Sequence, residues 1–307
     1  MNERRILVVA HARRDDTVQA AHRVVAALRA AGATPVLSAE DRDELAAADP
    51  LFHDVELLAD RTGEGGVSVE DIELAIVLGG DGTILRAAEL VREGTAPILG
   101  INMGHVGFLA EIERDDMDAA VARVIDRDYS VEERMALAVR VKDAAGAVVY
   151  STWALNEATV EKSSRERMIE VIVEIDGRPL TSFGCDGMVV STPTGATAYN
   201  FSAGGPVIWP GVEAIAVVPL SAHALFARPL VVAPGAPVAI ELLDRNDGNA
   251  ILWCDGRRSH DLPRGARVIV RRSSRPVRLA RLHPSVFTDR LVRKFQLPVS
   301  GWRGADS

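Results

Sequence analysis

Short apolar runs alternate with helical patterns over roughly the first 130 residues. Apolar runs of strand length occur at 6–10, 34–37, 74–78 and 96–101, and helical patterns at 17–31, 40–48, 83–92 and 115–126. Gly32 ends the first helical pattern, as glycine commonly does at a helix C-terminus. Strands that alternate with helices indicate a parallel sheet covered by helices on both faces. This part of the chain is therefore predicted to form a Rossmann-like α/β domain.

From about residue 131 the pattern changes to short β-rich runs. They occur at 137–141, 147–150, 158–160, 169–175, 188–191, 215–219, 238–243, 251–253 and 268–270. Turn signals such as Asp176-Gly177 and Asp255-Gly256 separate them, which predicts a β-sandwich-type domain. A helical pattern returns at 286–295 and is expected to fold back onto the first domain. The predicted domains are 1–130 plus 284–307 (α/β) and 131–283 (β-rich).

Composition limits the class of protein. A hydrophobic content of 48% and a charged content of 25% in 307 residues are typical of a globular chain with a substantial core. The formal net charge of −8 argues against a general nucleic-acid binder. Cys185 and Cys254 show no metal-binding spacing and favour a reducing cytoplasm. No apolar run has the length of a membrane span or signal peptide, so we expect no membrane partner.

The first candidate site is a glycine turn after the third apolar run, where Gly79, Gly80, Gly82 and Thr83 surround Asp81. A strand, a glycine turn and a helix in succession offer main-chain N–H groups to an anion such as phosphate. A carboxylate is unexpected in an anion site, so Asp81 is a candidate general base for a hydroxyl that receives a phosphoryl group. The structural alternative, that Asp81 caps the helix, is equally compatible with the sequence.

The second candidate site is the segment 184–205, which is rich in glycine and hydroxyl side chains. A strand-like run enters this segment, and Tyr199 is available to stack on a base. A turn-rich connection within a β domain is the structural alternative, but the density of small polar residues favours a ligand loop. The chain contains no P-loop motif, dinucleotide fingerprint or zinc-binding set.

The candidate segments occur in an order that resembles the NAD kinase family over about residues 6–297. The segments that carry the resemblance are Gly79–Thr83, Asn156-Glu157, Asp186-Gly187 and Thr192–Tyr199, with Gly204–Pro206 and Asp255-Gly256 as looser matches. The glycine–aspartate element alone also occurs in 6-phosphofructokinases and diacylglycerol-type lipid kinases. The threonine-proline-threonine-glycine element with its tyrosine is much more specific.

The resemblance implies transfer of a phosphoryl group from ATP, or from inorganic polyphosphate in some members, to the adenosine ribose 2′-hydroxyl of NAD. It implies a divalent metal, Mg²⁺, with unidentified protein ligands, and a cytoplasmic homo-oligomer, either dimer or tetramer. Asp81 matches the catalytic base. The implied ligand-binding positions are Gly79, Gly80, Gly82, Thr83, Asn156, Glu157, Asp186, Thr194, Thr197, Ala198, Tyr199, Asn200 and Ser202, with Arg86 and Arg167 as anion contacts. Asp186 matches a contact that an adjoining subunit can supply, and Ala196 stands where the family commonly has serine or threonine.

Two other functions are compatible with parts of this pattern. A lipid or sugar kinase would share the glycine–aspartate element, although no membrane-docking amphipathic stretch supports a lipid acceptor. A nucleotide-binding regulator without turnover would not need Asp81, Asn156 and Glu157 to be intact.

Several other charged and aromatic residues have structural interpretations. Residues 257–294 hold twelve Lys or Arg against two acids, which favours solvated strand faces, with attraction of polyphosphate as the alternative. Glu111 and Glu113 are interpreted as a solvated face, and Trp253 as a core residue.

Overall fold

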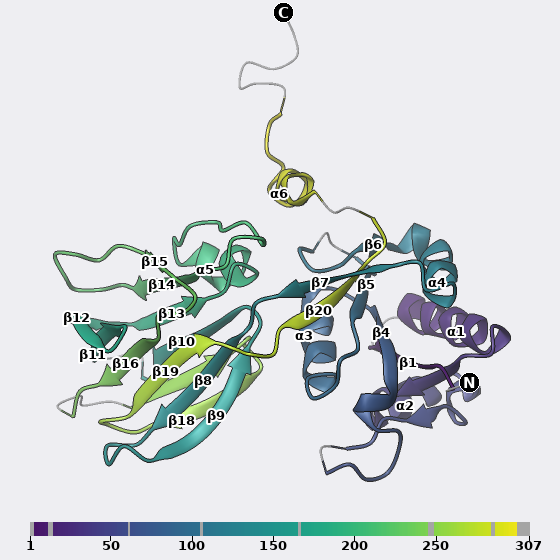
Figure 1. The fold of residues 1–307 in the computed structure, drawn as a ribbon, viewed down its shortest axis with the longest axis horizontal. Helices are drawn as coiled ribbons and strands as arrows, with labels where there is room; N and C mark the ends of the chain where they lie inside the picture. The colour runs from purple at the N-terminus through teal and green to yellow at the C-terminus, as the bar shows by residue number, and fades with distance from the viewer. Residues whose placement is uncertain are drawn as a thin grey trace, which may run out of the picture. The chain divides into compact units, whose positions relative to one another are not determined.

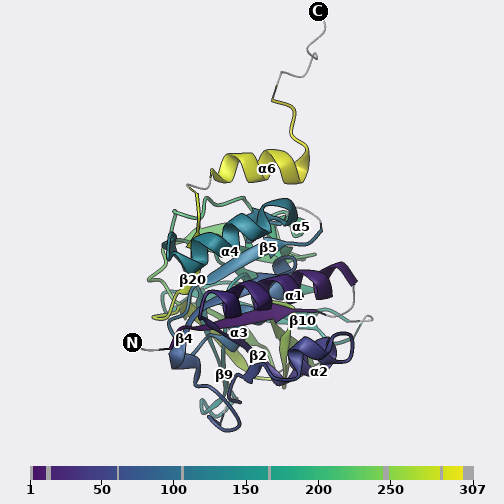
Figure 2. The same ribbon diagram turned by 90° about the vertical axis from the view of Figure 1, so that its right-hand side faces the viewer.

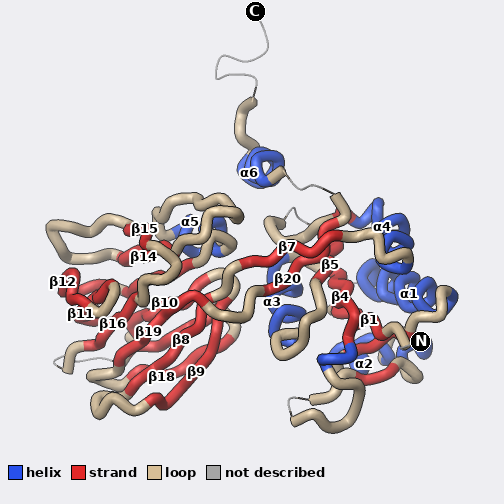
Figure 3. Tube along the Cα trace, viewed as in Figure 1, coloured by secondary structure: helices blue, strands red, loops and turns tan. Residues whose placement is uncertain are grey.

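The computed structural model describes residues 3–11, 15–60, 62–104, 107–164, 167–244, 249–283 and 286–299. The chain forms two compact units, which we call unit 1 (Met1–Glu133 with Val277–Ser307) and unit 2 (Arg134–Pro276). Helices are concentrated in unit 1, whereas unit 2 consists mainly of strands and loops (Figure 1, Figure 3).

Unit 1 is built on one sheet with the strand order β3-β2-β1-β4-β5-β20-β7, and β6 pairs with β5. Parallel pairing joins β1 to β2 and β4, and β5 to β4, β6 and β20. The elements, with η for 3-10 helices, are β1 (Arg5–Ala10), α1 (Asp15–Ala30), β2 (Thr34–Leu37), α2 (Ala39–Ala46), η1 (Pro50–Phe52), β3 (Glu56–Leu57), η2 (Val69–Asp71), β4 (Ile72–Leu78), α3 (Asp81–Leu90), β5 (Ile98–Asn102), β6 (Ile112–Glu113), η3 (Arg114–Asp116), α4 (Met117–Ile125), β7 (Ser130–Arg134), β20 (Val277–Arg281) and α6 (Phe287–Phe295). This confirms the predicted Rossmann-like parallel sheet and the C-terminal helix.

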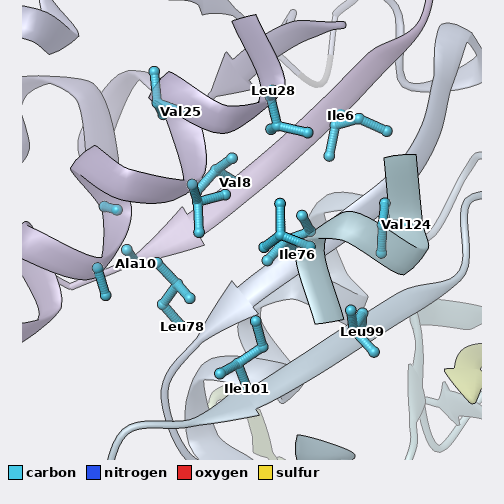
Figure 4. Close-up of a cluster of buried hydrophobic side chains, with 14 of the residues drawn as sticks. Ile6, Val8, Ala10, Val25, Leu28, Ile76, Leu78, Leu99, Ile101 and Val124 are labelled. Atoms are coloured by element: carbon cyan, nitrogen blue, oxygen red, sulfur yellow. The ribbon is translucent and has the colours of Figure 1, made fainter. Parts of the chain in front are cut away.

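The core of unit 1 lies on both faces of this sheet. Helices α1 and α4 cover one face, where Val25 and Leu28 of α1 pack over Ile6 and Val8 of β1 (Figure 2, Figure 4). Because side chains alternate along a strand, Leu7 points to the opposite face, and it is equally buried. Burial on both faces explains the continuous apolar runs that identify these strands in the sequence.

Unit 2 is a sandwich of two six-stranded sheets, with the orders β15-β14-β13-β10-β17-β18 and β12-β11-β16-β19-β8-β9. Its elements are β8 (Leu137–Lys142), β9 (Val148–Ala154), β10 (Glu157–Lys162), β11 (Ile169–Ile175), β12 (Arg178–Cys185), β13 (Gly187–Ser191), η4 (Gly195–Thr197), α5 (Tyr199–Ser202), β14 (Ile215–Leu220), β15 (Leu230–Val232), β16 (Val238–Leu242), β17 (Ala250–Cys254), β18 (Arg258–Leu262) and β19 (Arg267–Arg272). The described pairings within these sheets are antiparallel. Val171 and Ile240 of one sheet share a core with Val190 and Leu252 of the other, as the sequence predicts.

The unit boundaries differ from the predicted 130/131 and 283/284. They lie at 133/134 and 276/277, because β7 and β20 join the sheet of unit 1. Residues 284–285 and 300–307 of the predicted first domain lie outside the described residues. In the parts of the chain that the structure describes, no helix is long and apolar enough to cross a membrane.

Many charges of the C-terminal basic stretch are neutralised within the protein. Arg258, Arg267, Arg281 and Arg290 all form ion pairs with carboxylates. The interpretation of this stretch as solvated strand faces is therefore wrong for these four residues. The separate interpretation of Glu111 as part of a solvated face is also wrong, because the side chain of Glu111 is only 3% exposed.

Candidate functional site

The glycine turn lies at the carboxyl end of β4. Strand β1 pairs with β2 on one side and with β4 on the other. The strand order therefore reverses between β1 and β4, which makes this position a topological switch point. In open α/β sheets, ligands bind at the carboxyl ends of the strands at such a switch point. The N-cap of α3 is Gly80, which has no side chain to satisfy the first N–H groups of the helix.

The three glycines of the turn have different steric roles. A Cβ atom on Gly79 would lie 2.3 Å from Oγ1 of Thr83, so this glycine allows a close internal contact. Gly80 and Gly82 are exposed, and added Cβ atoms there would meet no described atom within 4 Å. Packing among the described residues therefore does not require these two glycines, whereas close approach of a phosphate to the main chain would.

Asp81 is the first residue of α3, and its carboxylate is held by a distant segment. Oδ2 accepts a hydrogen bond from the N–H of Phe108, and Oδ1 accepts one from the N–H of Leu109, both at 3.0 Å. The capping alternative is wrong, because the N-cap is Gly80 and Asp81 binds this segment instead. The side chain of Asp81 remains half-buried.

Two predicted anion contacts beside Asp81 face the protein interior. Thr83 is buried against Gly79. Arg86 is 6% exposed, and its guanidinium donates to Oδ1 of Asp41 at 2.5 Å and to the carbonyl of Ala10 at 3.2 Å. Burial raises the pKa of Asp41, against the lowering effect of the Arg86 guanidinium. In this arrangement Arg86 fixes α2 and β1 rather than facing an anion.

Unit 2 contains a cavity of about 400 Å³. It is lined by Glu157, Thr159, Glu161, Tyr199, Trp253, Asp255 and Gly256. Two carboxylic acids of β10 and two aromatic residues thus face the same space. Small-molecule sites typically range from about 300 to 1,000 Å³, so this cavity has room for one end of a dinucleotide.

Glu157 is a buried acid of the cavity. It is 7% exposed, and its Oε2 has no hydrogen-bond partner among the residues that the structure describes. Burial, helped by the nearby Asp255 carboxylate, raises the pKa of Glu157 to about 8. The side chain is therefore a neutral carboxylic acid at pH 7, able to donate a hydrogen bond as well as to accept one.

The backbone around Asn156 and Glu157 is fixed by the hairpin turn at Asp255. The Asp255 carboxylate accepts the N–H of Leu155 at 2.9 Å and the N–H of Asn156 at 2.7 Å. The N–H of Asp255 donates in return to the carbonyl of Glu157 at 3.0 Å. From the other side Gly195 comes so close that a Cβ there would lie 2.1 Å from the Asn156 carbonyl oxygen.

Only part of the hydroxyl-rich segment is accessible to a ligand. Tyr199 and Ser202 are exposed, Thr197 and Ala198 are half-buried, and Thr194 is buried. Tyr199 alone of these lines the described cavity.

Asn200 has an internal role that the sequence does not predict. Its side chain is fully buried, and Nδ2 donates to the carbonyls of Ala196 at 3.3 Å and Pro206 at 3.1 Å. Asn200 therefore shapes the loop, and because its Oδ1 has no hydrogen-bond partner among the described residues, a ligand contact at Asn200 stays a prediction. Ala196 is also fully buried and packs with Ile208. A serine or threonine hydroxyl at this position would therefore lie inside the protein rather than at its surface.

Asp186 and Arg167 do not line the cavity of unit 2. Asp186 pairs with Nζ of Lys162 at 2.5 Å, and this hydrogen bond lowers the pKa of Asp186. Arg167 is exposed and lies just before β11.

Three cavity residues are missing from the sequence predictions. Thr159 and Glu161 follow Glu157 at intervals of two residues along β10. The period-2 pattern of a strand could therefore have placed all three on the same face. Trp253 lies directly opposite Thr159 on β17, a neighbour that only the strand pairing reveals. The interpretation of Trp253 as a core residue is wrong, because it is half-buried at the cavity.

The fold and its two groups of polar residues are those of a two-domain, nucleotide-binding transferase. Residues 6–129 match the model of the ATP-NAD kinase N-terminal domain, and residues 155–282 match that of the ATP-NAD kinase C-terminal domain. The chain therefore belongs to the NAD kinase family, which confirms the resemblance.

Comparisons over the full chain agree. The chain is 63% identical to the NAD kinase of Leifsonia xyli, covering 99% of this chain and 98% of that protein. It is 55% identical to NAD kinase 2 of Streptomyces coelicolor, covering 98% and 97% of the two chains. The crystal structure of yeast NADH kinase complexed with NADH has the same fold, with a TM-score of 0.83 at 20% identity over 98% of this chain and 89% of that one.

Proposed function

We propose that this chain transfers the terminal phosphoryl group of ATP to the 2′-hydroxyl of the adenosine ribose of NAD, with Asp81 as the general base. The observation that carries this proposal is the position of Asp81, between two exposed glycines at the N-terminus of α3. Membership of the NAD kinase family supports the reaction and does not favour a lipid kinase, a sugar kinase or a regulator without turnover.

The glycine turn supplies what phosphoryl transfer requires, which is mainly positioning and neutralisation of charge. The N–H groups of Thr83 and Ile84 already donate to the carbonyl of Gly80. The N–H groups of Asp81 and Gly82 precede these bonds and are available for phosphate oxygens. Each Asp81 oxygen accepts one backbone hydrogen bond and keeps a further lone pair for the ribose hydroxyl.

A divalent metal, which we propose to be Mg²⁺, would neutralise charge on the phosphates. Among the described residues no group of three or more His, Cys, Asp or Glu side chains converges as a metal site. Mg²⁺ does not require such a group, because it usually binds through substrate phosphates, water and one or two carboxylates. Asp81 is the carboxylate of the glycine turn in a position to contribute.

The cavity of unit 2 is the proposed site for the adenosine end of NAD. Tyr199 and Trp253 offer aromatic faces for stacking. Glu157 can donate a hydrogen bond because it is neutral at pH 7, and Glu161 can accept one from an amino group. Asn156 precedes Glu157 on a backbone that Asp255 holds in place, and it is the other proposed contact of the adenosine end.

A homo-oligomer is part of the proposal. Leu180, Leu225, Phe226 and Val231 of unit 2 are all at least 50% exposed, and we propose that contact with a second copy covers apolar side chains of this kind. Cys185 and Cys254 are buried free thiols, as expected in the proposed cytoplasmic location.

The test is formation of NADP from NAD, or of NADPH from NADH, by the purified protein with ATP or polyphosphate as donor. With NAD and ATP, Asp81→Asn is expected to lower kcat by about 10²–10⁴-fold, the usual contribution of a general base, while calorimetry still detects NAD binding. Asp71→Asn is the matched control, because Asp71 is an exposed acid of the same unit. Full activity of Asp81→Asn would remove Asp81 from the role of base.

A further inference from the structure

The position of Asp81 depends on a segment far away in the sequence. Both oxygens of its carboxylate accept backbone N–H groups, from Phe108 and from Leu109. The segment can come this close because residue 107 is glycine: a Cβ on Gly107 would lie 2.3 Å from Oδ1 of Asp81. Whatever fixes residues 107–111 therefore also fixes the carboxylate.

The C-terminal helix α6 binds the same segment through Arg290. Nη1 of Arg290 donates to the carbonyls of Phe108 at 2.6 Å and of Ala110 at 2.7 Å, and Nη2 donates to Oε2 of Glu111 at 3.0 Å. A single peptide group thus joins the two sites: its carbonyl, from Phe108, accepts from Arg290, and its N–H, from Leu109, donates to Asp81. Hydrogen bonds at both ends of one peptide polarise it in the same direction and strengthen each other.

Aromatic packing holds α6 against this segment. The ring of Phe108 lies 6.1 Å from the ring of Phe287 and 5.8 Å from that of Phe295, both in tilted arrangements. Phe287, Leu291 and Phe295 follow each other at intervals of four residues, so they share one face of the helix. Leu291 of this face is buried.

Glu111 connects the segment to the central sheet. Its Oε2 accepts from Nη1 of Arg281 at 2.8 Å, and its Oε1 accepts the N–H groups of Leu282 and His283, both at 3.2 Å. Because Arg281 ends β20, which pairs with β5, one buried carboxylate joins the sheet and α6 to the segment that holds Asp81.

We propose that Arg290 is a positioning residue for the phosphoryl transfer, acting through the Phe108–Leu109 peptide on the carboxylate of Asp81. The inference rests on the proposed role of Asp81 as the base. A helix near the end of the chain thereby determines the geometry of a turn between β4 and α3. Arg290 itself touches neither substrate in this account.

The experiment compares kcat, the KM for NAD and the KM for ATP in Arg290→Gln, Arg290→Lys and Arg293→Gln. Arg293 is exposed on the same helix and serves as the matched control. Arg290→Gln is expected to lower kcat by roughly 10- to 100-fold, because small displacements of a reacting group have effects of this size, with both KM values within about twofold. Arg290→Lys, which retains the charge but not the planar fork, is expected to recover part of the loss. Thermal unfolding establishes that each variant is folded.

A double mutant separates positioning from a general structural role. If Arg290 acts through Asp81, adding Arg290→Gln to Asp81→Asn lowers kcat by less than about twofold. The inference is overturned if Arg290→Gln has the kcat of Arg293→Gln, or if its effect is the same with and without Asp81. Failure of the proposed function has a different signature, because Asp81→Asn alone would then retain full activity.

Discussion

Asp81 and Glu157 are both acids, and the structure gives them opposite surroundings. Asp81 is half-buried and accepts two backbone N–H groups, as an ionised carboxylate does well. Glu157 is buried, and one of its oxygens has no partner among the described residues. The first arrangement leaves each Asp81 oxygen able to accept a further hydrogen bond, and burial of Glu157 keeps a proton on its side chain at neutral pH.

The raised pKa of Glu157 predicts that the free energy of unfolding depends on pH. Glu157 holds its proton up to a pKa of about 8 in the folded protein, against the ordinary value of 4.5. Between these values unfolding releases a proton, so the free energy of unfolding falls as pH rises from about 4.5 to about 8. Glu157→Gln removes this contribution.

Denaturant unfolding at pH 6 and pH 9 measures the effect. The stability of Glu157→Gln relative to the wild type is expected to rise by about 3 kcal/mol between the two pH values. Asp261→Asn, which changes an exposed acid on β18, is the control. An equal difference between Glu157→Gln and the wild type at both pH values would contradict the assignment of a neutral, buried acid.

Among the secondary-structure elements, the apolar pattern of the sequence predicts strands that are buried on both faces and misses strands at the edge of a sheet. The apolar runs of β1 and β4 identify these strands because both of their faces are covered. By contrast, β12 and β18 lie at sheet edges. Most of their residues are exposed or half-buried, and their sequences show no clear apolar face. Strand β20 is short and rich in arginine, and it becomes recognisable only through its pairing with β5.

The same distinction applies to the candidate site. Local motifs point to Asp81 and Tyr199, because glycine turns and hydroxyl-rich loops are local features of the sequence, and Glu157 is predicted only from the family resemblance. Local motifs do not reveal the internal partners of Arg86 and Asn200: Asp41 comes from a distant part of the chain, and Pro206 lies six residues along the same loop. The support of Asp81 by the 107–111 segment and α6 is invisible for the same reason.

The glycine turn allows function to be separated from stability. Gly82 lies in the first turn of α3 with open space among the described residues, so Gly82→Ala is expected to leave stability unchanged or raise it by up to about 1 kcal/mol. The same methyl group would push a phosphate away from the main chain. Loss of one hydrogen bond to a charged group, about 1.5 kcal/mol, raises the KM for ATP roughly 10-fold.

Gly79→Ala is the matched comparison, because its Cβ would meet Thr83 and destabilise the turn itself. Thermal unfolding and the KM for ATP are measured for both variants. An unchanged KM for ATP in a stable Gly82→Ala protein would argue against phosphate binding at this turn.

At the scale of the whole molecule, the two units differ in how they use the chain. Unit 2 is continuous, from Arg134 to Pro276, and has its own core. Unit 1 is discontinuous, since β20 and α6 come from the end of the chain. Without β20, β5 loses the pairing of Ile98 with Leu279, and a part of this buried strand is left as an open edge.

Isolated fragments test this organisation. Residues 134–276 are expected to fold alone, with a β-type circular dichroism spectrum and cooperative thermal unfolding. Residues 1–133 are expected to aggregate, and co-expression with residues 277–307 to reduce the aggregation. An unfolded 134–276 fragment would show that its core depends on unit 1.

The central claim is that Asp81 removes the proton of the NAD ribose 2′-hydroxyl. The most direct measurement is a crystal structure with bound NAD. If Asp81 is the base, one of its carboxylate oxygens lies within about 2.6–3.2 Å of that hydroxyl or is joined to it by one water molecule. A ribose held well beyond this distance, with no bridging water, would contradict it.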